Sequence, residues 1–306
     1  MNEFHHVTVL LEETVMALRP APGGIYLDGT AGGGGHTALL LEHINDQGVV
    51  YAMDQDPDAI EHLDQKFRDK PAVHIIHGNF FEAAQLLPGV AFDGILLDLG
   101  VSSHQLDTDA RGFSYHREAP LDMRMSQSGT SAAELVNSLS EQELANMFFQ
   151  LAQEKFSRPI ARAVVKARTQ ASIATTTQLA EIVANAVPAA ARRDGHPARK
   201  VFMALRYACN GELDGLEEAL LGLFDMLRPG GCMAVITFNS LEDAAMKRVT
   251  KQLCAGCICP PEFPVCNCGI KPRAKVPQKP VKPSENELNL NPRARSAKLR
   301  TLEKIR

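Results

Sequence analysis

Short apolar runs alternate with amphipathic stretches along the first hundred residues. Four apolar runs have the length of buried strands and lie at 25–27, 49–53, 73–76 and 92–97. Three stretches carry apolar residues at helical spacing and lie at 9–18, 37–43 and 57–68. Alternating short strands and helices are typical of a parallel sheet with helical crossovers, so we expect an α/β fold here.

The pattern changes after Asp107. Residues 130–207 contain no strand-like run and predict several helices. Two of these helices begin with capping boxes, formed by Ser140 with Glu143 and by Thr175 with Gln178. Strand character returns at 233–238, after an expected helix at 212–227 and an expected turn at 228–231.

The simplest domain organisation is therefore an interrupted one. Residues 1–107 and 208–306 form an open α/β domain, and residues 108–207 form an all-helical domain inserted into it. Residues 271–296 are rich in Pro, Lys and Asn, which predicts an extended segment within a basic C-terminal arm that begins at about 269.

Charge is distributed unevenly along the chain. The 306 residues carry a net charge of −4, yet residues 1–150 hold 7 Lys and Arg against 22 Asp and Glu. Residues 151–210 hold 10 basic against 3 acidic residues, and residues 269–306 hold 11 against 3. Local positive segments on an acidic body favour a polyanion such as nucleic acid as partner. A solvated helix face and a solvated tail are the alternative interpretation.

Composition and cysteine spacing bear on compartment and metals. No apolar run reaches the roughly 18 residues of a membrane span, and the N-terminus lacks a secretion signal, so we expect a cytoplasmic protein without membrane contact. Five of the seven cysteines cluster near the C-terminus, at Cys254, Cys257, Cys259, Cys266 and Cys268. In a reducing compartment such a cluster indicates zinc or free thiols, and the tight spacing leaves both open.

A glycine-rich turn at 29–35 follows the first expected strand. Its backbone N–H groups are open to a ligand at the start of a helix. Asp54 ends the second strand, where its carboxylate can accept hydrogen bonds from both ribose hydroxyls of a nucleoside, and Asn79 with Phe80 suits an adenine. The turn at 228–231 resembles the late-strand loop of class I methyltransferases, which favours S-adenosylmethionine over NAD as the ligand.

Seven longer segments carry recognisable motifs: His6–Leu11, Asp28–His36, Met53–Pro57, Gly94–Ser103, Arg111–Ser114, Pro120–Met125 and Asn291–Ser296. In these segments the chain resembles the small-subunit ribosomal RNA cytosine-N4 methyltransferases, the RsmH or MraW family, nearly end to end. The resemblance implies a class I, Rossmann-like sheet that binds S-adenosylmethionine, with an inserted helical domain. It also implies methyl transfer to the exocyclic N4 of a decoding-centre cytosine of 16S ribosomal RNA, within the small ribosomal subunit.

The resemblance also implies a set of site residues. The family's cofactor contacts fall on seven residues of this chain: Gly34, Gly35, His36, Asp54, Phe80, Asp98 and Gln105. The chain departs from the family at Asn239, where the family usually has histidine. Because an asparagine side chain both donates and accepts, we expect a hydrogen-bonding position there rather than a proton carrier.

The target amine sets the remaining requirements. The N4 lone pair of cytosine is delocalised into the ring, so the site must orient the amine and accept its proton. Asp98, at the end of the fourth strand, supplies such an acceptor, although it can instead hold the amino group of the cofactor. Phe113 and Tyr115 are candidates to stack the extruded base, with packing between domains as the alternative for Phe113.

Basic residues of the helical insertion are candidates for binding the RNA backbone. Arg158, Arg162 and Lys166 recur at helical spacing and can share one face. Two further hypotheses stay open: another nucleic-acid amino-methyltransferase, and a non-catalytic RNA-binding protein on the same fold. The missing Pro-Pro-aromatic sequence after Asp98 speaks against the first, and the intact glycine turn with Asp54 and Asp98 speaks against the second.

Overall fold

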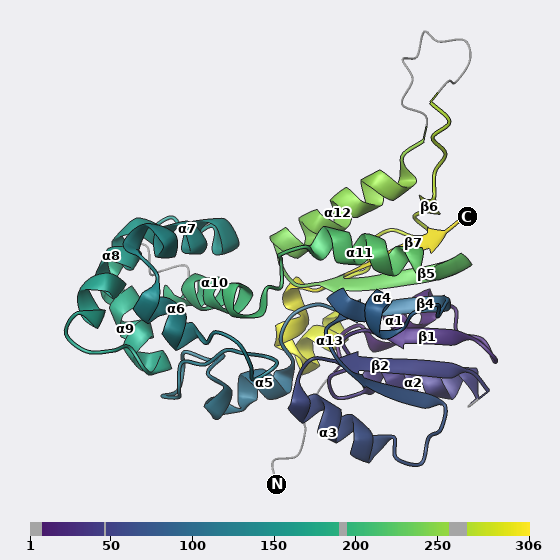
Figure 1. Cartoon of the computed structure of the whole chain (residues 1–306), viewed down its shortest axis with the longest axis horizontal. Coiled ribbons are helices and arrows are strands. Elements are labelled where there is room, and N and C mark those ends of the chain that lie inside the picture. The colour runs from purple at the N-terminus through teal and green to yellow at the C-terminus, as the bar shows by residue number, and fades with distance from the viewer. Residues whose placement is uncertain (1–7, 46, 190–194, 257–267) are drawn as a thin grey trace. The chain divides into compact units, whose positions relative to one another are not determined.

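The protein folds into two compact units. The computed structural model describes residues 8–45, 47–189, 195–256 and 268–306. Unit 1 comprises Met1–Gly100 and Gly215–Arg306, and unit 2 comprises Val101–Asp214 (Figure 1). The domain boundaries expected from the sequence therefore lie inside unit 2 rather than at its ends. Within the described ranges, no helix is long and apolar enough to cross a membrane.

Unit 1 is built on a seven-stranded sheet with the order β3-β2-β1-β4-β5-β7-β6. Its strands are β1 (Ile25–Asp28), β2 (Val49–Asp54), β3 (Val73–His77), β4 (Phe92–Asp98), β5 (Leu227–Thr237), β6 (Ala274–Lys275) and β7 (Lys298–Lys304). Neighbouring strands from β3 to β5 pair in parallel, whereas β7 pairs antiparallel with both β5 and β6. The expected parallel α/β sheet is confirmed, including its first four strands.

Helices join these strands and complete the core of unit 1. They are α1 (Leu11–Ala17), α2 (Gly35–Ile44), α3 (Pro57–Lys66), η1 (Phe80–Glu82), α4 (Ala83–Leu86), α11 (Leu216–Asp225), α12 (Ser240–Cys254), α13 (Glu285–Leu290) and η4 (Pro292–Ser296). Leu40 of α2 and Leu63 of α3 are buried in one apolar cluster with Val50 and Leu96 of the sheet. Burial of such side chains contributes about 1.5–3 kcal/mol each and fixes the strand ends that carry the polar residues described below.

Two sequence expectations around β5 need correction. Residues 228–231 are part of β5 rather than a turn before it, and they form an irregularity between the pairs Phe92↔Leu227 and Gly94↔Cys232. The helix expected from residue 212 begins at Leu216, because Gly215 adopts φ 75° at its N-cap. Glycine reaches this left-handed conformation without the steric cost that other residues incur.

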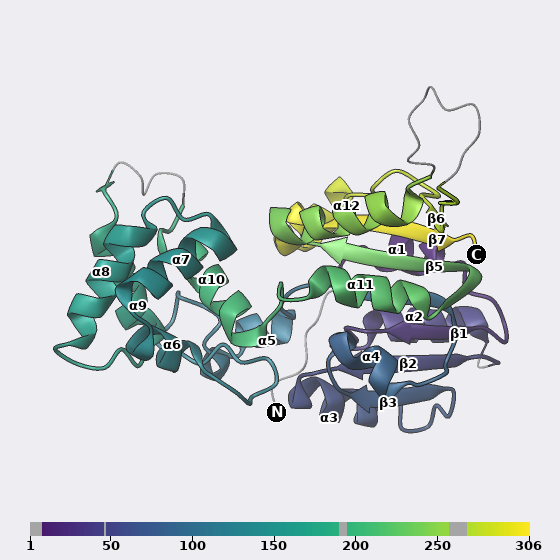
Figure 2. The ribbon, with the colours of Figure 1, turned by 45° about the horizontal axis from the view of Figure 1, so that its top comes forward.

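The extended conformation predicted for 271–296 is wrong for part of that segment, which contains α13 and η4. The basic arm that begins at about 269 also contains β7, which lies along β5 with the pairs Cys232↔Glu303 to Thr237↔Lys298 (Figure 2). Leu299 and Leu302 of β7 are 1% and 0% exposed. A strand at the edge of a sheet has unpaired N–H and C=O groups, and β7 satisfies those of β5.

A buried ion-pair network joins α12 to β7. Asp243 accepts a hydrogen bond from Arg300 Nε at 2.7 Å and pairs with Lys247 Nζ at 2.8 Å, while its side chain is 5% exposed. Burial alone would raise the pKa of Asp243, but the hydrogen bonds from Arg300 and Lys247 prevail and lower it to about 2. The ionised carboxylate is therefore part of what holds β7 against α12.

We expect Asp243→Asn to lower the free energy of unfolding by about 1.5–3 kcal/mol near neutral pH, since hydrogen bonds to a charged group are lost. Because the pKa of Asp243 is lower in the folded protein than its ordinary value of 3.8, the ionised carboxylate stabilises the fold above pH 3.8. This stabilisation disappears as the pH falls through about 2. The difference in the free energy of unfolding between Asp243→Asn and wild type, measured by urea unfolding, should therefore become smaller between pH 4 and pH 2. Glu217→Gln breaks an exposed pair with Arg248 and should cost less than about 1 kcal/mol.

Unit 2 is helical, as the sequence predicts. Its elements are α5 (Ser103–Asp107), η2 (Asp109–Arg111), α6 (Ala132–Ser138), α7 (Glu141–Ala152), α8 (Ser157–Arg168), α9 (Thr176–Ala186) and α10 (Ala198–Asn210) (Figure 1). The capping boxes predicted for α7 and α9 are both present. The apolar faces of α6 to α10 share one core, which includes Phe148 and Val164.

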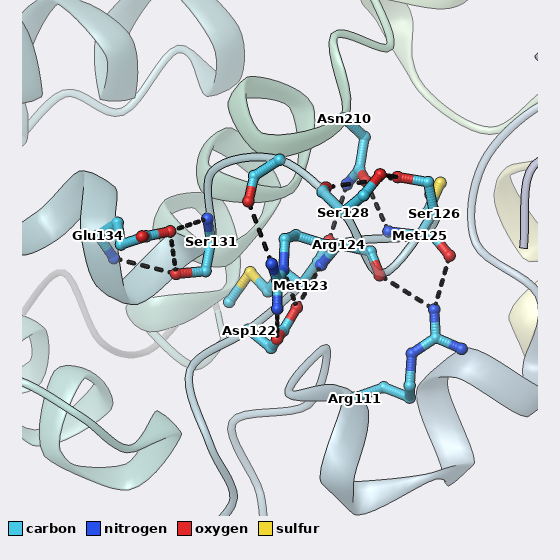
Figure 3. A network of polar contacts seen from close by, with 11 residues as sticks. Arg111, Asp122, Met123, Arg124, Met125, Ser126, Ser128, Ser131, Glu134 and Asn210 are labelled. Carbon is cyan, nitrogen blue, oxygen red and sulfur yellow. Dashed lines mark hydrogen bonds and ion pairs between the residues drawn. The ribbon is translucent and has the colours of Figure 1, made fainter.

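The loop between η2 and α6 is held by a polar network rather than by regular structure (Figure 3). Arg111 Nη2 donates to the carbonyl oxygens of Arg124 and Met125, at 3.0 and 2.8 Å. Asn210, the last residue of α10, donates to Met123 O and accepts from Met125 N. Met123 is fully buried at φ 64°, a conformation that L-residues rarely adopt. These bonds satisfy the backbone groups of the loop and offset the strain at Met123.

Candidate functional site

Three aspartates end neighbouring parallel strands of unit 1. Asp28 ends β1, Asp54 ends β2 and Asp98 ends β4, and β1 lies between the other two strands. Because parallel strands present their carboxyl ends at one edge of a sheet, the three carboxylates gather there. In open α/β sheets, this edge is where ligands bind.

The glycine turn between β1 and α2 passes over the same edge. Gly32 and Gly34 have φ 49° and 68°, so the backbone turns in a way that side chains disfavour. A Cβ on Gly34 would lie 2.8 Å from Leu63 Cδ2, and one on Gly29 would lie 2.6 Å from Leu97 Cδ2. The turn therefore packs directly on the core, with Gly34 as the N-cap of α2.

Two side chains from other elements hold the turn in place. Gly32 N donates to Asp54 Oδ2 at 2.8 Å. Lys66 Nζ donates to the carbonyl oxygens of Gly33 and Gly34, at 2.7 and 3.1 Å. The sequence offered no signal for Lys66, because it lies 33 residues from Gly33 and only the packing of α3 brings them together.

Asp28 is a site residue that the sequence analysis did not single out. Its side chain is fully buried, accepts from Thr37 Oγ1 at 2.8 Å and accepts from Thr30 N at 3.3 Å. Burial raises the pKa values of both Asp28 and Asp54 to about 6. The signal was present in the sequence, since Asp28 ends an apolar run in the same way as Asp54 and Asp98 do.

Asp98 has the least satisfied carboxylate of the three. Its Oδ1 atom is buried and has no hydrogen-bond partner among the described residues. Its backbone N–H donates to Thr30 Oγ1 at 2.6 Å, which ties β4 to the glycine turn. Burial, followed by the charges of Asp28, Glu242 and Glu287, raises the pKa of Asp98 well above its ordinary value. An unpartnered buried acceptor is costly, so the site favours a ligand that donates to it or carries positive charge.

The other candidates from the sequence in unit 1 lie around this edge. Phe80 follows β3 and stacks on Phe81 with ring centroids 4.6 Å apart, and its Cβ would lie 3.3 Å from a Cβ on Gly29. Asn79 donates to Gln55 Oε1 at 3.0 Å, which joins the loops after β2 and β3. His36 is buried in the first turn of α2.

Asn239 occupies the N-cap of α12, directly after β5. Its Oδ1 accepts from Leu241 N at 2.9 Å and from Glu242 N at 3.0 Å. Asparagine is among the best residues for this position. The structure thus provides a hydrogen-bonding role for Asn239, at the start of the helix that also carries Glu242, one of the carboxylates that raise the pKa of Asp98.

The remaining candidates belong to unit 2. Gln105 is 5% exposed and forms a capping box with Ser102 at the start of α5. Phe113 is 7% exposed and lies in the core of unit 2, which favours packing over base stacking for this ring. Tyr115 is half-buried at the surface.

The basic residues predicted to share a face of α8 do so. Arg158, Arg162 and Lys166 are exposed, opposite the buried Ile160 and Val164. Arg162 forms an exposed pair with Glu141 at 3.4 Å. These side chains are therefore accessible to a polyanion.

Most of the cysteine cluster lies outside the described residues. Cys257, Cys259 and Cys266 belong to that part of the chain, so the zinc hypothesis stays a prediction. Cys254 and Cys268 are both half-buried. Among the described residues, no group of three or more His, Cys, Asp or Glu is arranged to hold a metal ion.

Comparison with known proteins covers the whole chain. The model of the MraW methylase family matches residues 3–305. Ribosomal RNA small subunit methyltransferase H of Heliobacterium mobile is 47% identical over 99% of this chain and 100% of its own length. The protein of the same name from Geobacter sp. strain M21 is 47% identical over 100% of both chains. An rRNA methylase structure from Streptococcus thermophilus aligns with 99% of this chain and 100% of its own, at a TM-score of 0.42 and 12% identity.

Proposed function

Because the chain belongs to the MraW methylase family, we propose that it methylates the exocyclic N4 of cytosine 1402 in the decoding centre of 16S ribosomal RNA. Family membership makes it an S-adenosylmethionine-dependent methyltransferase, and its strand order is typical of class I enzymes of this kind. The names of its relatives support ribosomal RNA of the small subunit as the substrate, and hence a cytoplasmic site of action.

The observation that carries this proposal is the buried Oδ1 of Asp98 beside the glycine turn, which has no hydrogen-bond partner within the described part of the chain. An exocyclic amine is a hydrogen-bond donor, and this atom is an acceptor to which no described residue donates. The carboxylate at the end of β4 can therefore orient the amine, which contributes to the rate by positioning. It can also take the proton that the amine releases.

The residues present fit the methyl donor. When bound, S-adenosylmethionine supplies a methyl group activated by a positively charged sulfur. Gly34 and Gly35 would approach it through the backbone, and Asp54 would accept from its ribose hydroxyls. Carboxylates at this edge suit a cationic ligand, because the negative charges of Asp28, Glu242 and Glu287 all act on the buried Asp98. Phe80 and Asn79 would bound the adenine.

The affinity for S-adenosylmethionine should depend on pH. Burial raises the pKa of Asp54 to about 6, whereas ribose donors favour its ionised form. Below pH 6 the Asp54 carboxyl must therefore lose its proton before S-adenosylmethionine binds. The affinity for S-adenosylmethionine should consequently be about tenfold lower at pH 5 than at pH 7. Titration calorimetry across this range checks it, and Asp54→Asn should flatten the profile. A wild-type affinity that is constant from pH 5 to pH 7 would contradict the proposed role of Asp54.

The exposed basic face of α8 is proposed to contact RNA phosphates. We expect Arg158→Glu combined with Arg162→Glu to raise the KM for RNA while leaving S-adenosylmethionine affinity intact. Each phosphate contact contributes roughly 0.9 to the slope of log affinity against log salt, so the slope should become shallower by about 2. Arg68→Glu with Lys70→Glu reverses two charges in unit 1 and should leave this slope unchanged. Equal losses of RNA and donor affinity in the α8 variant would contradict a separate RNA-binding role.

The decisive test of the proposed function is the product in RNA. The gene is deleted, 16S ribosomal RNA is purified, and its nucleosides are analysed by mass spectrometry, with wild-type and Asp98→Ala complementation in parallel. We expect N4-methylcytidine to fall on deletion and to return only with the wild-type gene. Unchanged N4-methylcytidine would refute the proposal, and loss of a different methylated nucleoside would indicate another nucleic-acid methyltransferase.

A further inference from the structure

Three rings gather at the surface of unit 2, and the site in unit 1 does not use them. Tyr115 stacks on His196 with centroids 4.7 Å apart and planes at 16°, and its centroid lies 4.4 Å from that of His116. His116 and His196 are exposed, and Tyr115 is half-buried. We call these three residues the aromatic platform.

The platform rests on the core of its own unit. Tyr115 meets Phe202 edge to face at 5.4 Å, and Phe202 is 4% exposed. His196 Nδ1 accepts a hydrogen bond from Ala198 N at 3.2 Å, which anchors the ring to the start of α10. The rings are therefore held in place before any ligand arrives, which reduces the entropy lost on binding.

Charged side chains beside the platform complement it. Arg199 and Lys200 are exposed in the first turn of α10, and Lys200 Nζ donates to Gln153 O at 3.1 Å. Burial, and next the neighbouring His116, lowers the pKa of His196, which favours the uncharged form of this ring. The site thus combines stacked ring faces with adjacent cationic side chains.

We propose that the aromatic platform stacks an unpaired base of single-stranded RNA while Arg199 and Lys200 contact the flanking phosphates. Stacking on aromatic side chains beside a basic surface is how proteins bind single strands with little sequence preference. A duplex hides its base faces and would not use the platform. The inference rests on the proposed function only for which RNA is bound, because the geometry concerns any unpaired base.

Two substitutions of His196 separate stacking from anchoring. His196→Asn keeps an acceptor for Ala198 N but removes the ring, whereas His196→Phe keeps a ring and removes the acceptor. The matched control is His74→Ala in unit 1, where an exposed histidine also stacks on a tyrosine, Tyr51, at 5.2 Å. Thermal unfolding of each variant shows whether the fold is intact.

The probe is a fluorescent single-stranded RNA of about 12 nucleotides and mixed sequence, read by anisotropy with the full chain. We expect His196→Asn to weaken binding by about five- to a hundredfold, His196→Phe to stay near wild type, and His74→Ala to have no effect. The affinity for an RNA duplex of equal length should be the same for wild type, both His196 variants and His74→Ala.

The outcomes separate this inference from the proposed function. Undetectable binding of the single strand by wild type, or equal losses in both His196 variants, would overturn the platform even if 16S RNA is methylated. Selective loss in His196→Asn would support it even if no N4-methylcytidine is found. If His196→Asn also raises the KM for RNA without changing kcat, the platform serves the methylation substrate.

Discussion

Asp98→Ala is expected to lower turnover by roughly 100-fold or more at saturating S-adenosylmethionine. The variant removes the only buried carboxylate oxygen at this strand edge that lacks a partner among the described residues. In the proposed mechanism this oxygen orients the target amine and takes its proton, so the variant loses both effects. Single-turnover methylation of small-subunit RNA measures this loss, with donor affinity measured in parallel by calorimetry.

Asp98→Asn distinguishes the two proposed catalytic roles of this carboxylate. Its amide oxygen still accepts a hydrogen bond, so the variant keeps part of the rate if Asp98 only orients the amine. If Asp98 takes the proton, Asn is nearly as damaging as Ala. Because the pKa of Asp98 is raised, wild-type turnover should increase with pH as the carboxyl ionises, and Asp98→Asn should lack this limb.

A third proposed role of Asp98 is to hold the methyl donor, and the same variants test it. We expect weaker donor binding in both variants, together with a loss of turnover that saturating donor does not restore. Recovery of turnover by saturating donor would limit Asp98 to donor binding. Wild-type turnover in both variants would show that the catalytic centre lies elsewhere.

Asp54→Ala is expected to weaken S-adenosylmethionine binding by about 1.5–3 kcal/mol, or roughly 10- to 150-fold. The change removes the proposed acceptor of the ribose hydroxyls. It also removes Asp54 Oδ2, which accepts a hydrogen bond from Gly32 N at 2.8 Å and so holds the glycine turn in place. Both losses act on binding, so titration calorimetry is the appropriate measurement.

Two companion variants isolate the cause. Asp54→Asn keeps an acceptor oxygen at lower charge and should lose less affinity than Asp54→Ala. Asp64→Asn removes an exposed acid of α3 and should bind the donor as wild type does. Unchanged affinity in Asp54→Ala would exclude Asp54 from the donor site.

Local sequence patterns were sufficient for much of this protein. Apolar runs of strand length followed by aspartate predicted β1, β2 and β4, and capping boxes predicted the starts of α7 and α9. The family motifs, confirmed by the match over residues 3–305, carried the class of reaction. These features are readable because each depends on residues within a few positions of one another.

Features that join distant segments were decided by the tertiary structure alone. β7 was mistaken for part of an arm because its partner, β5, lies about sixty residues earlier and supplies the hydrogen bonds that make the segment a strand. Lys66 reaches the glycine turn, and Glu242 and Glu287 raise the pKa of Asp98, only through packing. Burial turned Phe113 into a core residue, and the ring contacts grouped Tyr115 with His196. Sequence pattern thus determined the helices and strands and the class of reaction. Desolvation and long-range contacts determined which carboxyl groups have shifted pKa values and which side chains are exposed to a ligand.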